Sequence, residues 1–328
     1  MGQQNNNEYQ VDEENPFAFS PRPLKDFSNE EFEQEPVEPT EVKRKIKDPE
    51  AMSAMPLFRT LSLDDLDNLP DPEWIVHGYI PADAMTTLIG APGSTKSFFA
   101  LDIACCIAAG QDFNGESVKK GKVIYCVGEG LRGMKWRIEA WKMAHPDADL
   151  EALESNLIIL PRAVMLLDKT EAGMLLNTAE SVNEEAPLRA FIIDTWARSL
   201  TGGDENSAQD VGIAINVCEN IRAKTGASPI VIHHTGADGT RERGSTALRG
   251  ATDTTIQMAH DEVSGIVSVT CKKMKDGEPF KPVKYELKTY GHSIVLTPIL
   301  LGNYGFSPQV RDKDYYIKKA IADKEAPF

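Results

Sequence analysis

The chain has 328 residues, of which 41% are hydrophobic, and this composition suits one large α/β domain with flexible ends. Its formal net charge of −15 excludes a uniformly basic protein that coats nucleic acid, although a single basic surface is compatible with it, because salt screens charges beyond about 8–10 Å. Five cysteines without metal-ligand spacing, no secretory signal and no apolar run of ~20 residues predict a cytoplasmic protein with reduced thiols and no membrane span.

Residues 1–55 contain 13 acidic and 6 basic residues and no sustained apolar period, which predicts a disordered acidic tail. Within this tail the basic run Val42–Lys47 is either a solvated linker or a contact for DNA or a partner. Phe17, Phe19 and Phe27 are candidates for recruiting a replication or recombination protein. The sequence then predicts one folded domain over residues 56–300 and a C-terminal extension over residues 301–328 with a short helix.

From Trp74 onward, apolar runs that are typical of buried strands alternate with helical stretches. The expected strands cover residues 85–89, 122–127, 157–160, 190–194 and 229–233, and the expected helices cover 96–109, 131–144, 171–185 and 208–224. Four more strands follow at 254–258, 265–271, 283–288 and 293–298, without helices between them. This order predicts a mostly parallel twisted sheet flanked by helices, with antiparallel strands at the C-terminal edge.

A glycine-rich loop follows the first of these strands and opens a helix. It consists of Gly90, Ala91, Pro92, Gly93, Ser94, Thr95, Lys96 and Ser97. The backbone N–H groups of such a loop converge on phosphate oxygens, while Lys96 reaches the β- and γ-phosphates of ATP and the Ser97 hydroxyl binds Mg²⁺. Thr95 stands where the usual pattern G-x-x-x-x-G-K-[ST] has its second glycine, so Gly93 is expected to supply the backbone freedom.

Two acidic residues end later strands, where the ligands of a parallel sheet collect. Asp194 ends the run Phe191–Asp194 and is placed to hold Mg²⁺ directly or through water. Glu129 ends the strand that is expected to neighbour the phosphate-loop strand, and it is either the base that orients and deprotonates the attacking water or a solvated loop acid. Together with the phosphate loop, these residues predict a site for ATP and Mg²⁺.

The adjacent pair His233 and His234 ends a further strand at the same edge. Adjacent side chains on a strand point to opposite faces, so the two histidines are poor joint ligands for one metal ion. We interpret the pair as a sensor of the γ-phosphate, in which one member is a hydrogen-bonded core residue.

Together these motifs resemble the RecA-like ATPase core over residues 74–298, and most closely its hexameric replicative-helicase branch, which includes small plasmid-encoded helicases. The resemblance implies that ATP binds between subunits of a homo-oligomeric ring, expected to be a hexamer, and that the neighbouring subunit supplies cations to the γ-phosphate. Lys273 and Lys275 match the spacing of the lysine and arginine that commonly do this, although the second position is lysine here. Lysine lacks the bidentate fork of arginine. Arg243 and Arg249 are therefore alternative candidates for the arginine that reaches the γ-phosphate in the neighbouring subunit.

The resemblance also implies that two polar, glycine-rich loops, at residues 199–210 and 235–245, face single-stranded DNA. Arg241 and Arg243 in the second loop are candidates for phosphate contacts, and neither loop carries an aromatic residue for base stacking. The expected function is therefore an ATP-driven motor of the hexameric helicase type that translocates on single-stranded DNA. A filament-forming recombination, repair or loader ATPase and a nucleotide switch without DNA remain alternatives.

Overall fold

The computed structural model describes residues 60–68, 72–236 and 243–299 of the chain. The predicted acidic tail, the predicted C-terminal extension and Arg241 lie outside these residues. The chain divides into two units after Asp67, and the first unit contributes only the short helix α2 (Leu63–Asp67) to the described residues. Ser62 caps this helix, because its hydroxyl accepts from the Asp65 N–H at 3.1 Å while the Asp65 carboxylate accepts from the Ser62 N–H at 2.8 Å.

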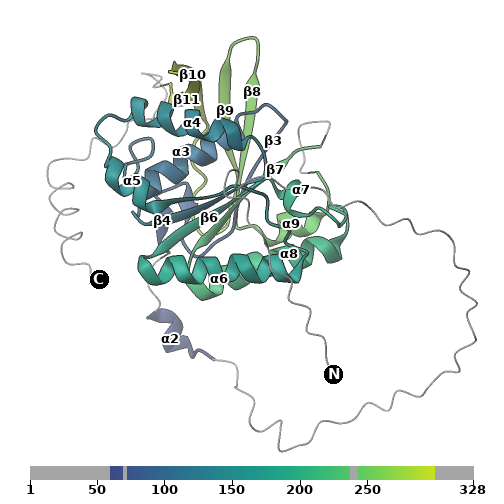
Figure 1. Ribbon diagram of the computed structural model, residues 1–328. Helices are drawn as coiled ribbons and strands as arrows, with labels where there is room; N and C mark the ends of the chain where they lie inside the picture. The colour runs from purple at the N-terminus through teal and green to yellow at the C-terminus, as the bar shows by residue number, and fades with distance from the viewer. Residues whose placement is uncertain (1–59, 69–71, 237–242, 300–328) are drawn as a thin grey trace, which may run out of the picture. The chain divides into compact units, whose positions relative to one another are not determined.

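Within the described part of the second unit, nine strands form one mixed sheet in the order β11-β10-β9-β8-β3-β7-β6-β4-β5 (Figure 1). The parallel strands are β3 (Thr86–Gly90), β4 (Lys122–Val127), β5 (Leu157–Leu160), β6 (Leu188–Asp194), β7 (Ser228–His234) and β8 (Thr254–Asp261). The antiparallel strands are β9 (Ile266–Met274), β10 (Val283–Tyr290) and β11 (Ser293–Pro298). The predicted fold class, a mostly parallel α/β sheet with an antiparallel C-terminal edge, is therefore confirmed.

Helices cover both faces of this sheet (Figure 1). One layer contains α3 (Lys96–Ala109), α4 (Leu131–Ala144) and α5 (Leu150–Asn156), together with the small hairpin of β1 (Trp74–Val76) and β2 (Ile80–Pro81). The other layer contains α6 (Lys169–Glu185), α7 (Trp196–Ser199), α8 (Ala208–Thr225) and α9 (Thr246–Ala251). The described helices include none that is long and apolar enough to cross a membrane.

The central strands are apolar throughout because each face of the sheet meets a helical layer. In β6, for example, Ile192 packs in the core on the α3 side, whereas Phe191 and Ile193 pack in the core on the α8 side. Helix α3 is enclosed most completely, with 12 of its 14 residues buried. A helix that is apolar on all sides is expected in such a position.

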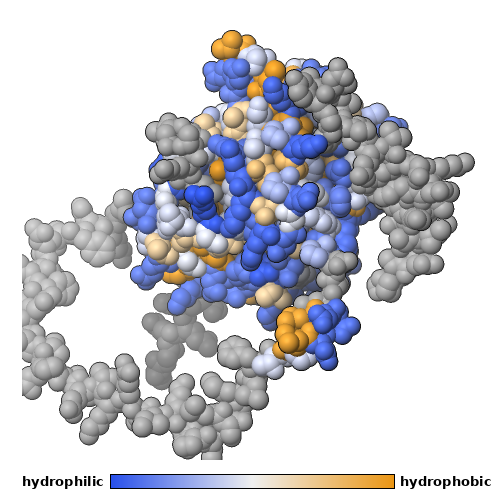
Figure 2. All heavy atoms as spheres, turned by 180° about the vertical axis from the view of Figure 1, so that it is seen from behind, coloured by the Kyte–Doolittle hydropathy of each residue, from blue (hydrophilic) through white to orange (hydrophobic). Residues whose placement is uncertain are grey.

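The carboxyl ends of the parallel strands lie at one edge of the sheet, and the loops that carry the predicted motifs begin there. The turn between β8 and β9 projects beyond this edge (Figure 1). Figure 2 shows an apolar tip at the top of an otherwise largely hydrophilic face, and the side chain at this turn, Val263, is 98% exposed. The fold thus gathers the ends of β3, β4, β6 and β7 on one side, where a ligand can reach them.

Candidate functional site

The phosphate loop leaves β3 at Gly90 and enters α3 at Lys96. A side chain at Gly90 would collide with its surroundings, because its Cβ would lie 2.4 Å from the Met258 carbonyl oxygen and 2.5 Å from Ser94 Oγ. Gly93 has φ 79°, and Thr95 has φ 64° and ψ 19°, so both adopt the left-handed conformation. Thr95 therefore replaces the second glycine of the motif while keeping the backbone conformation that glycine would have.

Lys96 is buried, and its ammonium group is held by the loop itself. It donates to the carbonyl oxygens of Gly90 at 2.9 Å and Ala91 at 2.8 Å, and to Ser94 Oγ at 3.2 Å. Burial lowers the pKa of Lys96 to about 8, although the charges of Asp194 and Glu129 oppose this shift. Because these partners are neutral oxygens, a phosphate would be the stronger ligand for this ammonium group.

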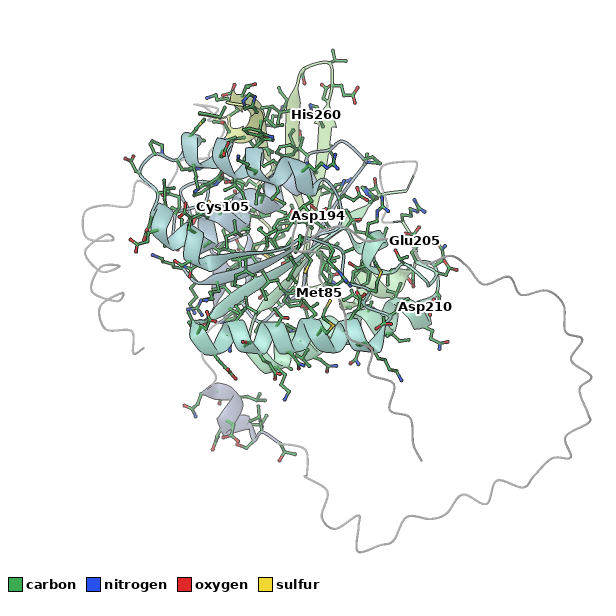
Figure 3. The ribbon with its side chains drawn as sticks, in the orientation of Figure 1. Met85, Cys105, Asp194, Glu205, Asp210 and His260 are labelled. Atoms are coloured by element: carbon green, nitrogen blue, oxygen red, sulfur yellow. The ribbon has the colours of Figure 1, made fainter. Side chains whose placement is uncertain are left out.

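Asp194 lies at the end of β6 and is buried (Figure 3). Its Oδ2 accepts a hydrogen bond from the Tyr125 hydroxyl at 2.9 Å, and the Ser97 side chain also hydrogen-bonds to it. Burial raises the pKa of Asp194, while these hydrogen bonds and the charge of Arg137 lower it. Its Oδ1 is buried without a hydrogen-bond partner among the described residues, which leaves one carboxylate oxygen for a ligand.

Ser97 and Asp194 are thus brought together, and their oxygen atoms fit the preference of Mg²⁺ for oxygen ligands. The described residues contain no group of three or more His, Cys, Asp or Glu side chains that could hold a metal by themselves. This suits Mg²⁺, which usually binds through one or two protein oxygens, substrate phosphates and water. The unpaired Oδ1 of Asp194 is the observation that supports this fit.

Glu129 follows β4, and its carboxylate accepts from Arg198 Nε on α7 at 2.9 Å. Both side chains are about half exposed, at 48% and 61%. The expectation that this strand neighbours the phosphate-loop strand is wrong, because β7 and β6 lie between β3 and β4 in the sheet. The charge of Glu129 nevertheless raises the pKa of Lys96 and of His234 across β6 and β7. Its predicted role as the base stays a prediction.

The two histidines at the end of β7 have different surroundings. His234 pairs with Gly90 across the sheet, and the charges of Lys96, Glu129 and Asp194 act on it. His233 instead hydrogen-bonds through Nε2 to the Arg243 carbonyl oxygen at 2.6 Å. Burial lowers the pKa of both rings. His234 is therefore the member that faces the phosphate loop, and His233 anchors the loop that follows β7.

The predicted cations are not all near the phosphate loop. Arg243 starts beside His234, with its N–H donating to the His234 carbonyl oxygen at 3.1 Å, and its guanidinium pairs with Glu205. Lys273 donates to the carbonyl oxygens of Arg249 at 3.1 Å and of Thr252, and so caps the C-terminus of α9.

Lys275 pairs with Asp253 at 3.4 Å, and Arg249 is exposed, with no side-chain partner among the described residues. The register of β8 and β9, which pairs Thr254 with Met274, places Lys273 and Lys275 near the amino end of the parallel strands. This is the end opposite the phosphate loop, so the structure does not bring these lysines to the loop of their own chain. Their role in a neighbouring subunit's site stays a prediction.

Four side chains at this edge were not singled out by the sequence: Tyr125, Arg137, Arg198 and Glu205. Tyr125 supports Asp194, Arg198 holds Glu129, and Glu205 holds Arg243. Arg137 lies over the Phe98 ring, 4.6 Å from its centroid. A charged residue one helical turn from a catalytic candidate is a weak sequence signal, and only the folded sheet shows which of these residues face the site.

A strand–loop–helix unit with a buried lysine, beside a serine and an aspartate suited to Mg²⁺, defines a P-loop nucleoside triphosphatase on an α/β sheet. A family model described as AAA domain matches residues 52–240, which is more than half of the chain. The chain therefore belongs to the AAA domain family, whose P-loop ATPase fold supports ATP binding and hydrolysis. A search of curated proteins gives no match.

Proposed function

We propose that this ATPase is a motor of the hexameric DNA helicase type, which hydrolyses ATP at subunit interfaces and translocates on single-stranded DNA. The observation that carries this proposal is the connection between two loops, 199–210 and the described part of 235–245. The first follows β6, which ends at Asp194, and the second follows β7, which ends at His234. The second loop therefore starts at a strand end that would face the nucleotide, and the first is joined to such a strand end by α7.

The two loops contact one another at Glu205. Its carboxylate pairs with Arg243, and its carbonyl oxygen accepts from the Ser245 N–H at 2.8 Å. The backbones pack so closely that a Cβ on Gly244, which has φ 86°, would lie 2.6 Å from the Glu205 carbonyl oxygen. A change at Asp194 or His234 on hydrolysis would then move both loops together, as a motor that acts through paired loops requires.

The placement of the cations supports hydrolysis between subunits. Lys275 lies at the opposite end of the sheet from Gly90, and Arg249, exposed and unpaired among the described residues, lies on α9 close to that end. A head-to-tail contact brings opposite ends of adjacent subunits together, and it forms a ring when the rotation between subunits closes. The same contact without closure gives a filament, which is the arrangement of the alternative recombination or loader ATPase.

A nucleotide switch without DNA is the second candidate, and the acidity of the first loop favours it. Asp204, Glu205 and Asp210 lie in this loop, and Glu205 neutralises the arginine that would meet a phosphate backbone. Any contact with DNA through Arg243 must therefore replace this ion pair. The Glu205 side chain is only 15% exposed, so displacing it by a phosphate would leave a mostly buried carboxylate without its partner.

The experiment compares ATP turnover of wild type, Lys96→Ala and Glu129→Gln with and without single-stranded DNA at low salt, where phosphate contacts are strongest. We expect turnover in the wild type that DNA stimulates, and almost none in either variant. Unwinding of a forked duplex and a ring-sized mass in ATP would complete the case. Turnover without DNA stimulation would favour the switch, and a filament that does not unwind DNA would favour the recombinase or loader. Full turnover by Lys96→Ala would overturn the ATPase site itself.

A further inference from the structure

Among the described residues Arg137 has no ion-pair partner, whereas several other arginines have a carboxylate. Arg198 pairs with Glu129, Arg243 with Glu205, and Arg222 with Asp83 and Glu219. Arg137 is half-buried, yet the described residues place no carboxylate within ion-pair distance of it. Holding a guanidinium in a partly enclosed place without a counter-charge is unfavourable, and an anionic ligand would remove that penalty.

The position of Arg137 is fixed by two contacts. Its guanidinium stacks on Phe98, which comes two residues after Lys96 in α3, at 4.6 Å from the ring centroid. Its Nη2 lies 3.1 Å from the point where a Cβ on Gly130 would be, and Gly130 directly follows Glu129. The absence of a side chain at Gly130 therefore leaves the space that this nitrogen atom uses.

Arg137 also acts electrostatically on the predicted Mg²⁺ ligand. Its charge lowers the pKa of the Asp194 carboxyl and of the Tyr125 hydroxyl, two neighbouring side chains on the central strands. Arg137 thus contacts the start of α3 through Phe98 and lies against Gly130, the residue after Glu129, while its charge acts on Asp194 at the end of β6. These are the three segments that would enclose the terminal phosphate of ATP.

We propose that Arg137 binds the γ-phosphate of the nucleotide from within the same subunit. A guanidinium presents a planar fork of N–H donors that matches phosphate oxygens, and stacking on Phe98 fixes the plane of that fork. Nη2 points toward Gly130, beside the carboxylate that is expected to act on the water attacking this phosphate. The inference rests on nucleotide binding at residues 90–97, and it does not depend on DNA or on a ring.

The competing explanation is that Arg137 only packs α4 against α3 through Phe98. Arg137→Met separates the two, because methionine retains an apolar stem over the ring and removes the guanidinium. Arg132→Met is the matched control. Arg132 lies in the same helix, is exposed, and has no ion pair among the described residues.

The experiment measures the affinity of the full chain for a non-hydrolysable ATP analogue and for ADP, both with Mg²⁺, by calorimetry. We expect Arg137→Met to weaken binding of the analogue about 10- to 100-fold, which is the usual effect of losing hydrogen bonds to a charged group. Binding of ADP should change less than about threefold, because it lacks the γ-phosphate. Arg132→Met should leave both affinities as in wild type. Unchanged binding of the analogue, or equal losses for the analogue and ADP, would overturn the proposal.

Thermal unfolding without nucleotide shows whether a variant has lost its fold. If Arg137→Met does not fold, Arg137→Gln is used in its place, because glutamine has a planar polar group. The expected result is the same: weaker binding of the ATP analogue and nearly unchanged binding of ADP. A wild-type chain that binds neither nucleotide would refute the ATPase site as well as the role of Arg137. If the wild-type chain binds the ATP analogue and ADP, and the Arg137 variant binds them with the same affinities, only the role of Arg137 is refuted.

Discussion

Thr95 shows how one residue can depart from a motif and still keep its geometry. Its left-handed backbone is costly for a residue other than glycine, by about 1–2 kcal/mol. Its hydroxyl offsets part of this, because it donates to the Ser94 carbonyl oxygen at 2.7 Å. The conformation is therefore maintained by the surrounding loop and not by the preference of threonine.

We expect Thr95→Gly to retain ATP turnover and to change the free energy of unfolding by less than about 1 kcal/mol. Relief of the left-handed strain is opposed by the lost hydrogen bond and by the greater freedom of glycine in the unfolded chain, at about 0.5–1 kcal/mol. Thr95→Val keeps the strain and loses the hydroxyl, so it should be the less stable of the two. Denaturant unfolding and ATP turnover of both variants provide the measurement. Loss of turnover in both variants would show that the hydroxyl has a direct role.

The lowered pKa of Lys96 predicts how nucleotide affinity depends on pH. Free Lys96 loses its proton as pH rises through about 8, whereas a bound triphosphate favours the protonated form. The complex therefore holds more protons than the free protein above pH 8, so binding must weaken there, by up to about tenfold per pH unit. Below pH 7 this effect is absent.

Titration of the chain with a fluorescent ATP analogue and Mg²⁺ between pH 7 and 9.5 measures this effect. Lys96→Arg is the control, because an arginine keeps its charge throughout this range and should give a flat profile at lower affinity. A wild-type affinity that stays constant from pH 7 to 9.5 would contradict the prediction.

At the scale of elements, the spacing of apolar residues and the positions of glycine and proline predicted most strands and helices from the sequence. The expected helix over residues 131–144 and the strand over 122–127 coincide with α4 and β4. The order of strands in the sheet could not be read in the same way, because continuous apolar runs do not identify their neighbours. For that reason Glu129, on the next long strand in the sequence, lies across β7 and β6 from the phosphate loop.

The site was predictable where chemistry follows a motif and not where it depends on packing. Ser97 and Asp194 were expected near one another, and the structure brings them into hydrogen-bonding contact. The distinction between His233 and His234 depends on the β3–β7 pairing, which the sequence does not show. Similarly, Lys273 matched a spacing, yet its ammonium group caps α9, a contact that exists only once β9 folds beside that helix.

At the scale of the whole molecule, an active site shared between subunits predicts complementation between two inactive variants. Lys96→Ala lacks a working phosphate loop, and Arg249→Ala would lack the cation supplied to the neighbour. In mixed rings some interfaces join an intact loop from one variant to an intact Arg249 from the other. Random mixing of equal amounts makes this roughly a quarter of all interfaces.

We therefore expect each variant alone to be nearly inactive, and the mixture to recover up to roughly a quarter of wild-type ATP turnover after subunit exchange. Lys275→Ala in place of Arg249→Ala distinguishes the two candidate cations in the same assay. Co-assembly must be shown by pull-down of differently tagged chains. Co-assembled but inactive mixtures for both cations would exclude them as trans-acting groups.

The enclosure of α3 limits how this molecule can move. The phosphate loop leads directly into α3 at Lys96. Helix α3 is surrounded by the β1–β2 hairpin, by α4 and α5, and by the sheet. Sliding or tilting α3 would open voids in a close-packed interior, which is strongly resisted. Helix α3 is therefore expected to stay fixed behind the phosphate loop, so that any movement in the proposed motor would occur in the loops beyond β6 and β7. In the proposed motor, hydrolysis would then displace these two loops against a helix that stays in place.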